Sequence, residues 1–175
     1  VLEGGWPWLL LLPLGIRLAW QRRSDCAGRW ELGLLLGSAA LVLPLRSQLP
    51  WYSHLLWPAI ALLCSEGLHQ VLISGRPRWI GQLWLLMGAT LLLAGLALMI
   101  SSPSIELPRL ALVCAGAGLI AGGRQLIQTT QRQRRRGLIT LLIGWGSALL
   151  ALWYSQLWLW ELNESWDPRA VASSI

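Results

Sequence analysis

The sequence predicts an all-α protein, a polytopic transmembrane bundle of about six hydrophobic helices. Of the 175 residues, 55% are hydrophobic and only 13% are charged, a balance that suits burial in lipid better than a surface facing water. With 13 Trp, two Tyr and no Phe, nearly every aromatic ring carries a polar N–H or O–H group, as anchoring at a membrane interface favours. A compositional bias towards Trp is the alternative explanation.

The helices follow from the apolar runs. A bilayer core of about 30 Å needs roughly 20 mostly apolar helical residues. Six segments approach that length, at residues 6–20, 30–45, 51–72, 79–100, 107–122 and 138–160. The connectors 21–29, 46–50, 74–78, 101–106 and 123–137 hold most of the Arg, Ser and Pro residues and are predicted to be turns. Residues 1–160 are expected to form the membrane region, and residues 161–175 an external polar tail or the start of a soluble domain.

The arginines predict how the helices are threaded. All 14 cationic side chains are Arg, and 11 of them flank the first, third and fifth connectors: Arg17, Arg22, Arg23, Arg29, Arg76, Arg78, Arg124, Arg132, Arg134, Arg135 and Arg136. The other side has only Arg46, Arg109 and Arg169. This alternation is what the positive-inside rule requires, so the Arg-rich connectors are expected in the cytoplasm and the C-terminus on the periplasmic or external side. The expected location is a bacterial inner membrane or a plasma membrane.

Several short patterns have a structural explanation. The small-xxx-small pairs Gly33/Gly37 and Gly118/Gly122 predict close helix packing. The run at 131–136, QRQRRR, is interpreted as a topogenic anchor rather than a nucleic-acid or anionic-lipid patch, and no nucleic-acid partner is expected. Glu66 and His69 lie one helical turn apart, but two ligands make no metal site.

No motif of a soluble catalytic site is present, and no cofactor or metal is predicted. Cys26, Cys64 and Cys114 lack the spacing of metal ligands and are expected to be small core residues. The chain starts with Val1 and its first apolar run lacks the features of a signal peptide, which suggests a fragment of a longer protein.

Three segments carry a resemblance to a known family. Residues 46–52 are R-S-Q-L-P-W-Y and residues 53–64 are S-H-L-L-W-P-A-I-A-L-L-C. They resemble the T-K-L-P-W-Y-x-L-P-x-Y-P-A-L-A-L segment of polytopic GT-C glycosyltransferases of the protein O-mannosyltransferase and lipid A aminoarabinose transferase type (glycosyltransferase family 39-like). Residues 5–14, G-W-P-W-L-L-L-L-P-L, are similar to the family's G-x-x-P-W-x-x-F-L-P-L helix, and residues 160–172 are similar to its L-N-E-x-Y-P-V-K-P-V-A passage.

The resemblance implies an enzyme that transfers a sugar from a polyprenyl-phosphate donor to an acceptor at the non-cytoplasmic face, without a metal. Such an enzyme neutralises the donor phosphate with cations while a carboxylate deprotonates the acceptor. Arg46, Tyr52 and His54 are the candidate residues for the donor-lipid phosphate. The family's Lys before Leu-Pro is Gln48 here, and Arg46 is the candidate replacement. The family's catalytic carboxylate lies in a first external loop that this chain does not contain, so the chain alone is expected to be inactive and no catalytic residue is assigned.

Two other hypotheses remain open. A non-catalytic membrane accessory or assembly protein would place Arg46 and His54 in headgroup contacts and helix packing. Haem handling is suggested by Trp158, Trp160, Trp166 and Asp167, with His54 as an axial ligand, but a second external His is missing.

Overall fold

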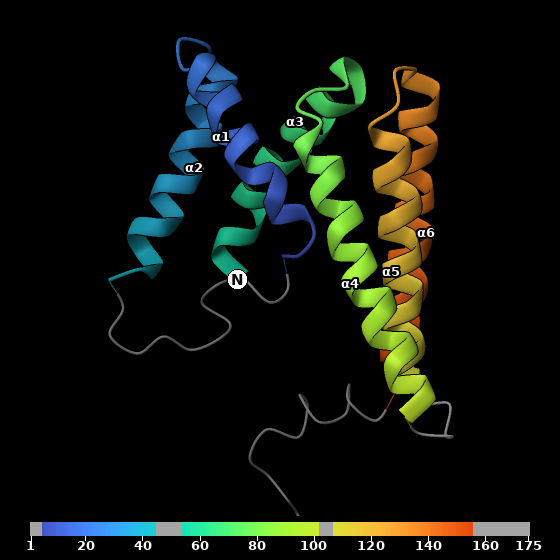
Figure 1. The fold of residues 1–175 in the computed structure, drawn as a ribbon. Helices are drawn as coiled ribbons and strands as arrows, with labels where there is room; N and C mark the ends of the chain where they lie inside the picture. Colours follow the sequence, from blue (N-terminus) through green and yellow to red (C-terminus); the bar gives the residue numbers. More distant parts are fainter. Residues whose placement is uncertain (1–4, 45–53, 102–106, 156–175) are drawn as a thin grey trace, which may run out of the picture. The chain divides into compact units, whose positions relative to one another are not determined.

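The chain is helical throughout the part that the structure describes. The computed structural model describes residues 5–44, 54–101 and 107–155. Those residues form six α-helices, with short 3-10 segments before α1 and α3 and no strand among them (Figure 1). The all-α class and the number of helices predicted from the sequence are therefore confirmed.

Three helices in the described part are long and apolar enough to cross a membrane. They are His54–Ser74, Trp79–Ser101 and Gln131–Trp153, with 21, 23 and 23 residues. At about 1.5 Å of rise per residue each exceeds the roughly 30 Å of a bilayer core. The segment Trp8–Gln21 is apolar but shorter.

The chain divides into two compact units, and unit 1 comprises Val1–Ile80. Its helices are η1 (Trp8–Leu11), α1 (Leu12–Gln21), α2 (Cys26–Val42) and α3 (Trp57–Ser74). Both α1 and α3 start with a Pro in the first turn, where its missing N–H breaks no helical hydrogen bond. α3 is capped by the next residue, Gly75, whose φ of 67° is a left-handed conformation that favours glycine.

Close backbone packing fixes α1 against α3. A Cβ atom on Gly15 would lie 1.9 Å from the carbonyl oxygen of Leu63, and one on Gly67 would lie 2.7 Å from that of Leu11. Leu11 and Leu63 are fully buried at this crossing. Without a hydrophobic drive between helices in lipid, such close approach supplies the packing energy.

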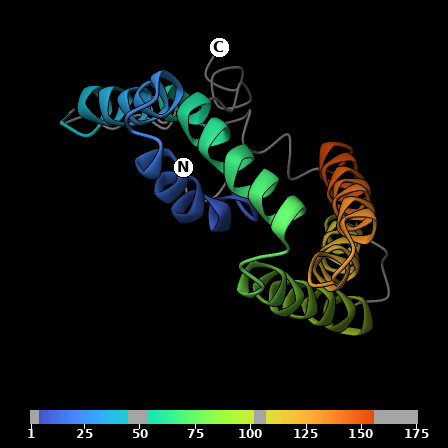
Figure 2. The same ribbon diagram turned by 90° about the horizontal axis from the view of Figure 1, so that it is seen from above.

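Unit 2 comprises Gly81–Ile175 and contains most of α4 (Trp79–Ser101), α5 (Leu107–Leu126) and α6 (Gln131–Trp153). Figure 2 shows α5 and α6 side by side. A Cβ atom on Gly144 would lie 2.5 Å from the Cα atom of Gly118, so the two backbones touch. Ala111, Ala115 and Ala148 continue this seam of small buried residues.

Three details of the sequence prediction are wrong. Cys26, predicted to be a small core residue, is exposed, whereas Cys64 is buried as predicted. The connector predicted at 123–137 is much shorter, because α5 continues to Leu126 and α6 begins at Gln131, so the QRQRRR run is the start of a helix. Gly118/Gly122 pack closely as predicted. Around Gly33 and Gly37, however, no atom lies within 4 Å of the position a Cβ would take, so the close packing predicted there is not found among the described residues.

Candidate functional site

Of the three predicted donor-phosphate residues, the structure describes one. Arg46 and Tyr52 lie outside the described residues, as do the acidic tail and the Trp-rich segment from 156 onwards. His54 starts a single 3-10 turn that leads into α3, and its side chain is exposed. In unit 1 this residue lies at the opposite end of α3 from Arg76 and Arg78.

An apolar cavity of about 340 Å³ lies between the beginning of unit 1 and the first half of α3. Its volume is within the range of roughly 300–1,000 Å³ that small-molecule sites occupy. The lining comes from two segments, and it consists of Gly5, Trp8, Leu11, Trp57, Ile60, Ala61, Cys64, Ser65 and Leu68.

The two lining segments are those that carry the family resemblance. Gly5, Trp8 and Leu11 belong to the segment at residues 5–14, which begins G-W-P-W. Trp57, Ile60 and Ala61 belong to the W-P-A-I-A segment. The fold thus brings together two motifs that are separated by about 45 residues of sequence. Neither motif by itself predicts a shared cavity.

The lining of this cavity is almost entirely apolar. The Ser65 hydroxyl donates to the carbonyl oxygen of Leu62 at 2.7 Å, so it is already occupied within its own helix. Trp8, Trp57 and Leu68 are half-buried, and Cys64 is buried. Such a surface suits a hydrocarbon chain, because an apolar ligand gives up no hydrogen bond on entering it.

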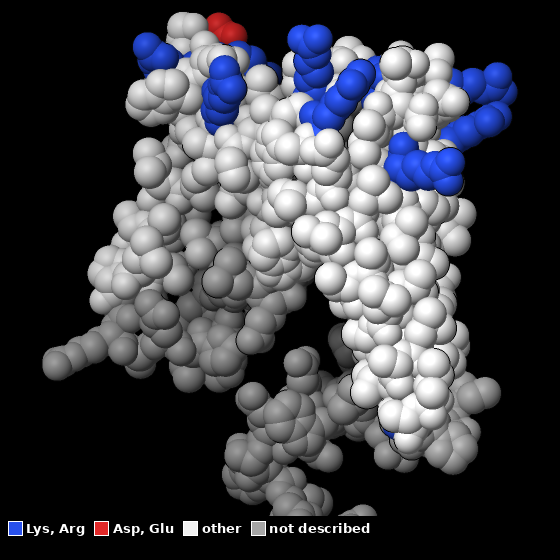
Figure 3. Space-filling view, in the orientation of Figure 1, with Lys and Arg blue, Asp and Glu red and all other residues white. Residues whose placement is uncertain are grey.

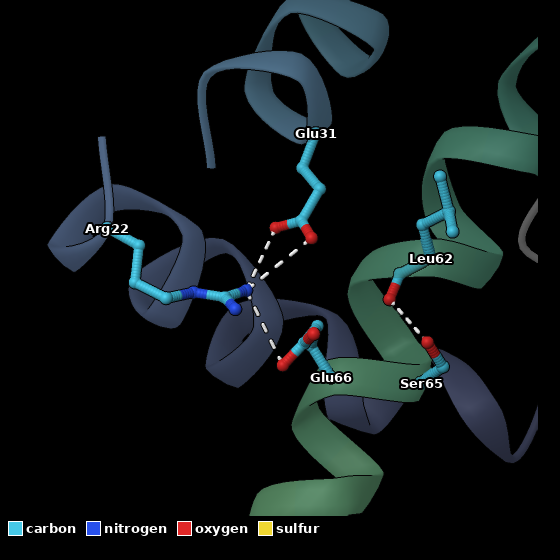
Figure 4. A network of polar contacts seen from close by, with 5 residues as sticks. All are labelled: Arg22, Glu31, Leu62, Ser65 and Glu66. Carbon is cyan, nitrogen blue, oxygen red and sulfur yellow. Dashed lines mark hydrogen bonds and ion pairs between the residues drawn. The ribbon is translucent and has the colours of Figure 1, made fainter. Parts of the chain in front are cut away.

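Ion pairs connect the three α-helices of unit 1 in a charged cluster (Figure 4). The Arg22 Nη2 atom lies 3.2 Å from Glu31 Oε2 and 3.4 Å from Glu66 Oε2. These residues come from the end of α1, the start of α2 and the middle of α3. The side chains of Glu31 and Glu66 are only 14% and 33% exposed, so one guanidinium compensates two carboxylates that are partly removed from water.

This cluster explains Glu66 without a metal or a proton relay. Spacing along the sequence pairs Glu66 with His69, but Glu66 bonds to Arg22, and His69 is exposed. Among the residues that the structure describes, no group of three or more His, Cys, Asp or Glu side chains could hold a metal ion. The pairing was missed because its partners are 44 residues apart in the sequence.

Arginine side chains gather at one end of each unit (Figure 3). In unit 1 they lie where α1 and α3 end and α2 begins, and the set consists of Arg17, Arg22, Arg23, Arg29, Arg76 and Arg78. In unit 2 they surround the turn between α5 and α6, and the set consists of Arg124, Arg132, Arg134, Arg135 and Arg136. Arg109 lies at the start of α5, at the opposite end of that helix.

One arginine of the run at 131–136 has a structural role. Arg134 is only 4% exposed, and its Nη1 donates to the carbonyl oxygens of Gln128 at 3.0 Å and Thr129 at 2.6 Å. These carbonyls belong to the turn after α5, where the helix leaves acceptors without partners. Arg132, Arg135 and Arg136 are exposed. The run therefore combines a buried turn clamp with exposed cationic side chains.

Comparison of the chain with protein-family models, with curated proteins and with solved structures found no match. The residues and their arrangement are therefore the basis for assigning a function.

Proposed function

We propose that this chain is the membrane part of a glycosyltransferase that uses a polyprenyl-phosphate-linked sugar at the non-cytoplasmic face. The observation that carries the proposal is the apolar cavity between two segments that each resemble the same family. A lipid-linked donor needs an apolar groove for its chain and cations at the end of that groove for its phosphate. Unit 1 offers the groove, and the R-S-Q-L-P-W-Y segment directly precedes the helix that forms one of its walls.

In this proposal the two parts of the donor bind at adjacent places. The polyprenyl chain lies against Trp8, Trp57 and Ile60 in the cavity. The phosphate lies near Arg46, Tyr52 and His54, which supply a guanidinium, a phenol and an imidazole as hydrogen-bond donors. His54 is close in sequence to Trp57, so this arrangement needs no long-range movement of the chain.

The chemistry assigned to these residues is charge stabilisation. An acceptor oxygen or nitrogen attacks the anomeric carbon, the bond from that carbon to the phosphate oxygen breaks, and the phosphate leaves with the bonding electrons. A carboxylate takes the proton from the acceptor. Arg46 stabilises the charge that grows on the leaving phosphate, which requires no metal. The carboxylate is not assigned to a residue of this chain.

The proposed orientation rests on the arginines. The Arg-rich end of each unit faces the cytoplasm, as the positive-inside rule requires. His54 and the apolar cavity then lie towards the opposite face, where lipid-linked sugars are consumed in enzymes of this kind.

Transfer of sugar from a polyprenyl-phosphate donor, measured in membranes that contain the complete protein, tests the proposal. Replacing Arg46 with Ala should reduce transfer by about 100-fold or more, as loss of one donor to a developing negative charge does, and Lys should restore part of it. Arg109→Ala is the matched control, since it removes an arginine predicted on the same face. Equal activity of the Arg46→Ala and control proteins at equal abundance would remove Arg46 from the donor site.

A non-catalytic accessory protein is the second candidate, and one observation favours it. Gly33 and Gly37 form a small-residue face on α2 with open space beside it, which would suit a helix of a partner protein. Purification from native membranes in mild detergent separates the two candidates. A stoichiometric partner that is lost on Gly33→Leu, together with absence of donor-lipid binding, would favour the accessory protein.

A further inference from the structure

Unit 1 contains a second cavity, at the Arg-rich end of α1 and α3. It has a volume of about 450 Å³ and is lined by Pro13, Leu14, Arg17, Leu18, Gln21, Gln70, Arg76, Pro77 and Trp79. Polar and apolar residues contribute side by side, in contrast to the apolar cavity at the other end of α3. Nothing in the proposed sugar transfer uses this second cavity.

The polar part of the lining is rich in hydrogen-bond donors. Arg17 and Arg76 supply two guanidinium groups, Gln21 and Gln70 supply amides, and Trp79 supplies an indole ring. No Asp or Glu is part of the lining. A group with several acceptor oxygens and a negative charge is the complement of such a set.

The two guanidinium groups of the cavity are not engaged elsewhere in the described part of the chain. Ion pairs there involve Arg22 with Glu31 and Glu66, and the turn carbonyls after α5 are bonded by Arg134. The guanidinium groups of Arg17 and Arg76 take part in no such contact, and both side chains are exposed. Their charge is therefore available to a ligand.

The helix ends do not cancel this charge. α1 and α3 both terminate at the cavity, and a helix C-terminus carries a partial charge of about −0.5. Two such ends amount to roughly one negative charge, whereas Arg17 and Arg76 carry one full positive charge each. The cavity keeps a net positive charge, and its guanidinium groups are forked donors that match a phosphate.

The cavity lies where apolar segments give way to polar ones. Arg17 is one turn before the end of α1, Gln70 is one turn before the end of α3, and Trp79 opens the span Trp79–Ser101. This is the level of lipid headgroups in a threaded chain. Pro13 and Leu14 precede Arg17 on α1 and add an apolar wall on the side away from the helix end, which suits the upper part of an acyl chain.

We infer that this cavity binds the phosphate group of an anionic phospholipid in the cytoplasmic leaflet, between Arg17 and Arg76. The apolar residues of the lining contact the acyl chain, and the amides of Gln21 and Gln70 bond to the remaining phosphate oxygens. Lipid binding here does not depend on sugar transfer, because it concerns a different cavity at the other end of α3.

Native mass spectrometry of the complete protein in detergent, with phosphatidylglycerol, phosphatidylcholine or inorganic phosphate added, tests the inference. Phosphatidylglycerol should bind in preference to phosphatidylcholine. The variant Arg17→Gln/Arg76→Gln should weaken phosphatidylglycerol binding by roughly tenfold or more, since each basic side chain near an anionic surface contributes about 1 kcal/mol. The control Arg29→Gln/Arg78→Gln loses the same charge at the same end of unit 1 but leaves the cavity lining intact.

The outcomes are distinct. Two results together support the inference. Phosphatidylglycerol binding is weakened in Arg17→Gln/Arg76→Gln but not in the control, and millimolar inorganic phosphate does not displace the lipid. Displacement of the lipid by micromolar phosphate would overturn the lipid assignment in favour of a soluble phosphate compound. Equal loss of phosphatidylglycerol binding in the two double variants, or no loss in either, would overturn the site itself. Gln70→Trp provides a second test, because it fills the cavity without removing a charge and should also weaken lipid binding.

Discussion

The two units of this chain use different means to hold their helices together. In unit 2, α5 and α6 touch backbone to backbone at Gly118 and Gly144, and Arg134 closes the turn between them. In unit 1, α1 and α3 also cross closely, but a charged cluster links α2 to them and a cavity lies at each end of the crossing. Both proposed ligand sites lie in unit 1, where the crossing of α1 and α3 leaves a cavity at each end.

The largest effect on stability is expected from Gly144→Leu. A Cβ at this position already falls 2.5 Å from the Gly118 Cα atom, so a longer side chain must separate α5 from α6. We expect a loss of about 3 kcal/mol or more in the free energy of unfolding, at the upper end of the usual cost of overpacking. Thermal unfolding in detergent, followed by circular dichroism, measures it.

Gly146→Leu is the matched control on the same helix, because no atom lies within 4 Å of its Cβ position. It should be neutral or stabilising by about 0.5–1 kcal/mol, since glycine is a poor helix former. A similar loss in both variants would mean that the Gly118–Gly144 contact does not hold the hairpin together.

Arg134→Gln should have the next largest effect. The shorter side chain leaves the carbonyl oxygens of Gln128 and Thr129 without their charged donor, at a cost of about 2 kcal/mol. Arg135→Gln, which changes an exposed neighbour, should stay within about 0.5 kcal/mol of the unchanged protein. Equal unfolding temperatures for the two variants would refute a structural role for Arg134.

Arg22→Gln should destabilise unit 1 by about 1 kcal/mol, because Arg22 is itself partly exposed and solvent screens its ion pairs. Adding Glu31→Gln should recover part of the loss, because one uncompensated carboxylate is then removed. The measurement is a double-mutant cycle of unfolding free energies. Additive effects would show that Arg22 and Glu31 do not interact.

Of these variants, Ala61→Trp should have the smallest effect on stability and the largest effect on binding of the lipid donor. Ala61 is exposed on the wall of the apolar cavity, so a larger ring there fills the cavity without displacing the buried core. Unfolding should stay within about 0.5 kcal/mol, while binding of a polyprenyl phosphate to the complete protein should be lost in native mass spectrometry. Unchanged lipid binding would place the donor chain elsewhere.

Helices and their charges were predictable, whereas contacts between distant segments were not. Apolar runs identified six helices because burial in lipid requires that composition, and the arginines gathered where the runs end. The sequence misplaces the start of α6 because the charged run at 131–136 is typical of a loop. Arg is nevertheless a good helix former, and Arg134 bonds to the preceding turn.

The geometry of the candidate site was not predictable from the sequence. The G-W-P-W and W-P-A-I-A segments were identified by resemblance. Their shared cavity, however, depends on how α1 crosses α3 at Gly15 and Leu63. The bond between Arg22 and Glu66 likewise depends on how α1 packs on α3. Spacing along the chain carries no information about such contacts.

The central claim is that the Arg-rich ends face the cytoplasm and that His54, beside the apolar cavity, faces the other side. Labelling with a membrane-impermeant maleimide in intact cells tests this claim most directly. Cys26 is an exposed natural reporter at the Arg-rich end of unit 1, and Cys64 and Cys114 are replaced with Ala so that Cys26 reports alone. In a background without any of these thiols, His54→Cys and Gln133→Cys each report a further position. We predict that the cysteine at 54 is labelled at once, and that Cys26 and the cysteine at 133 react only after permeabilisation. Equal labelling of Cys26 and the cysteine at 54 in intact cells would contradict this threading.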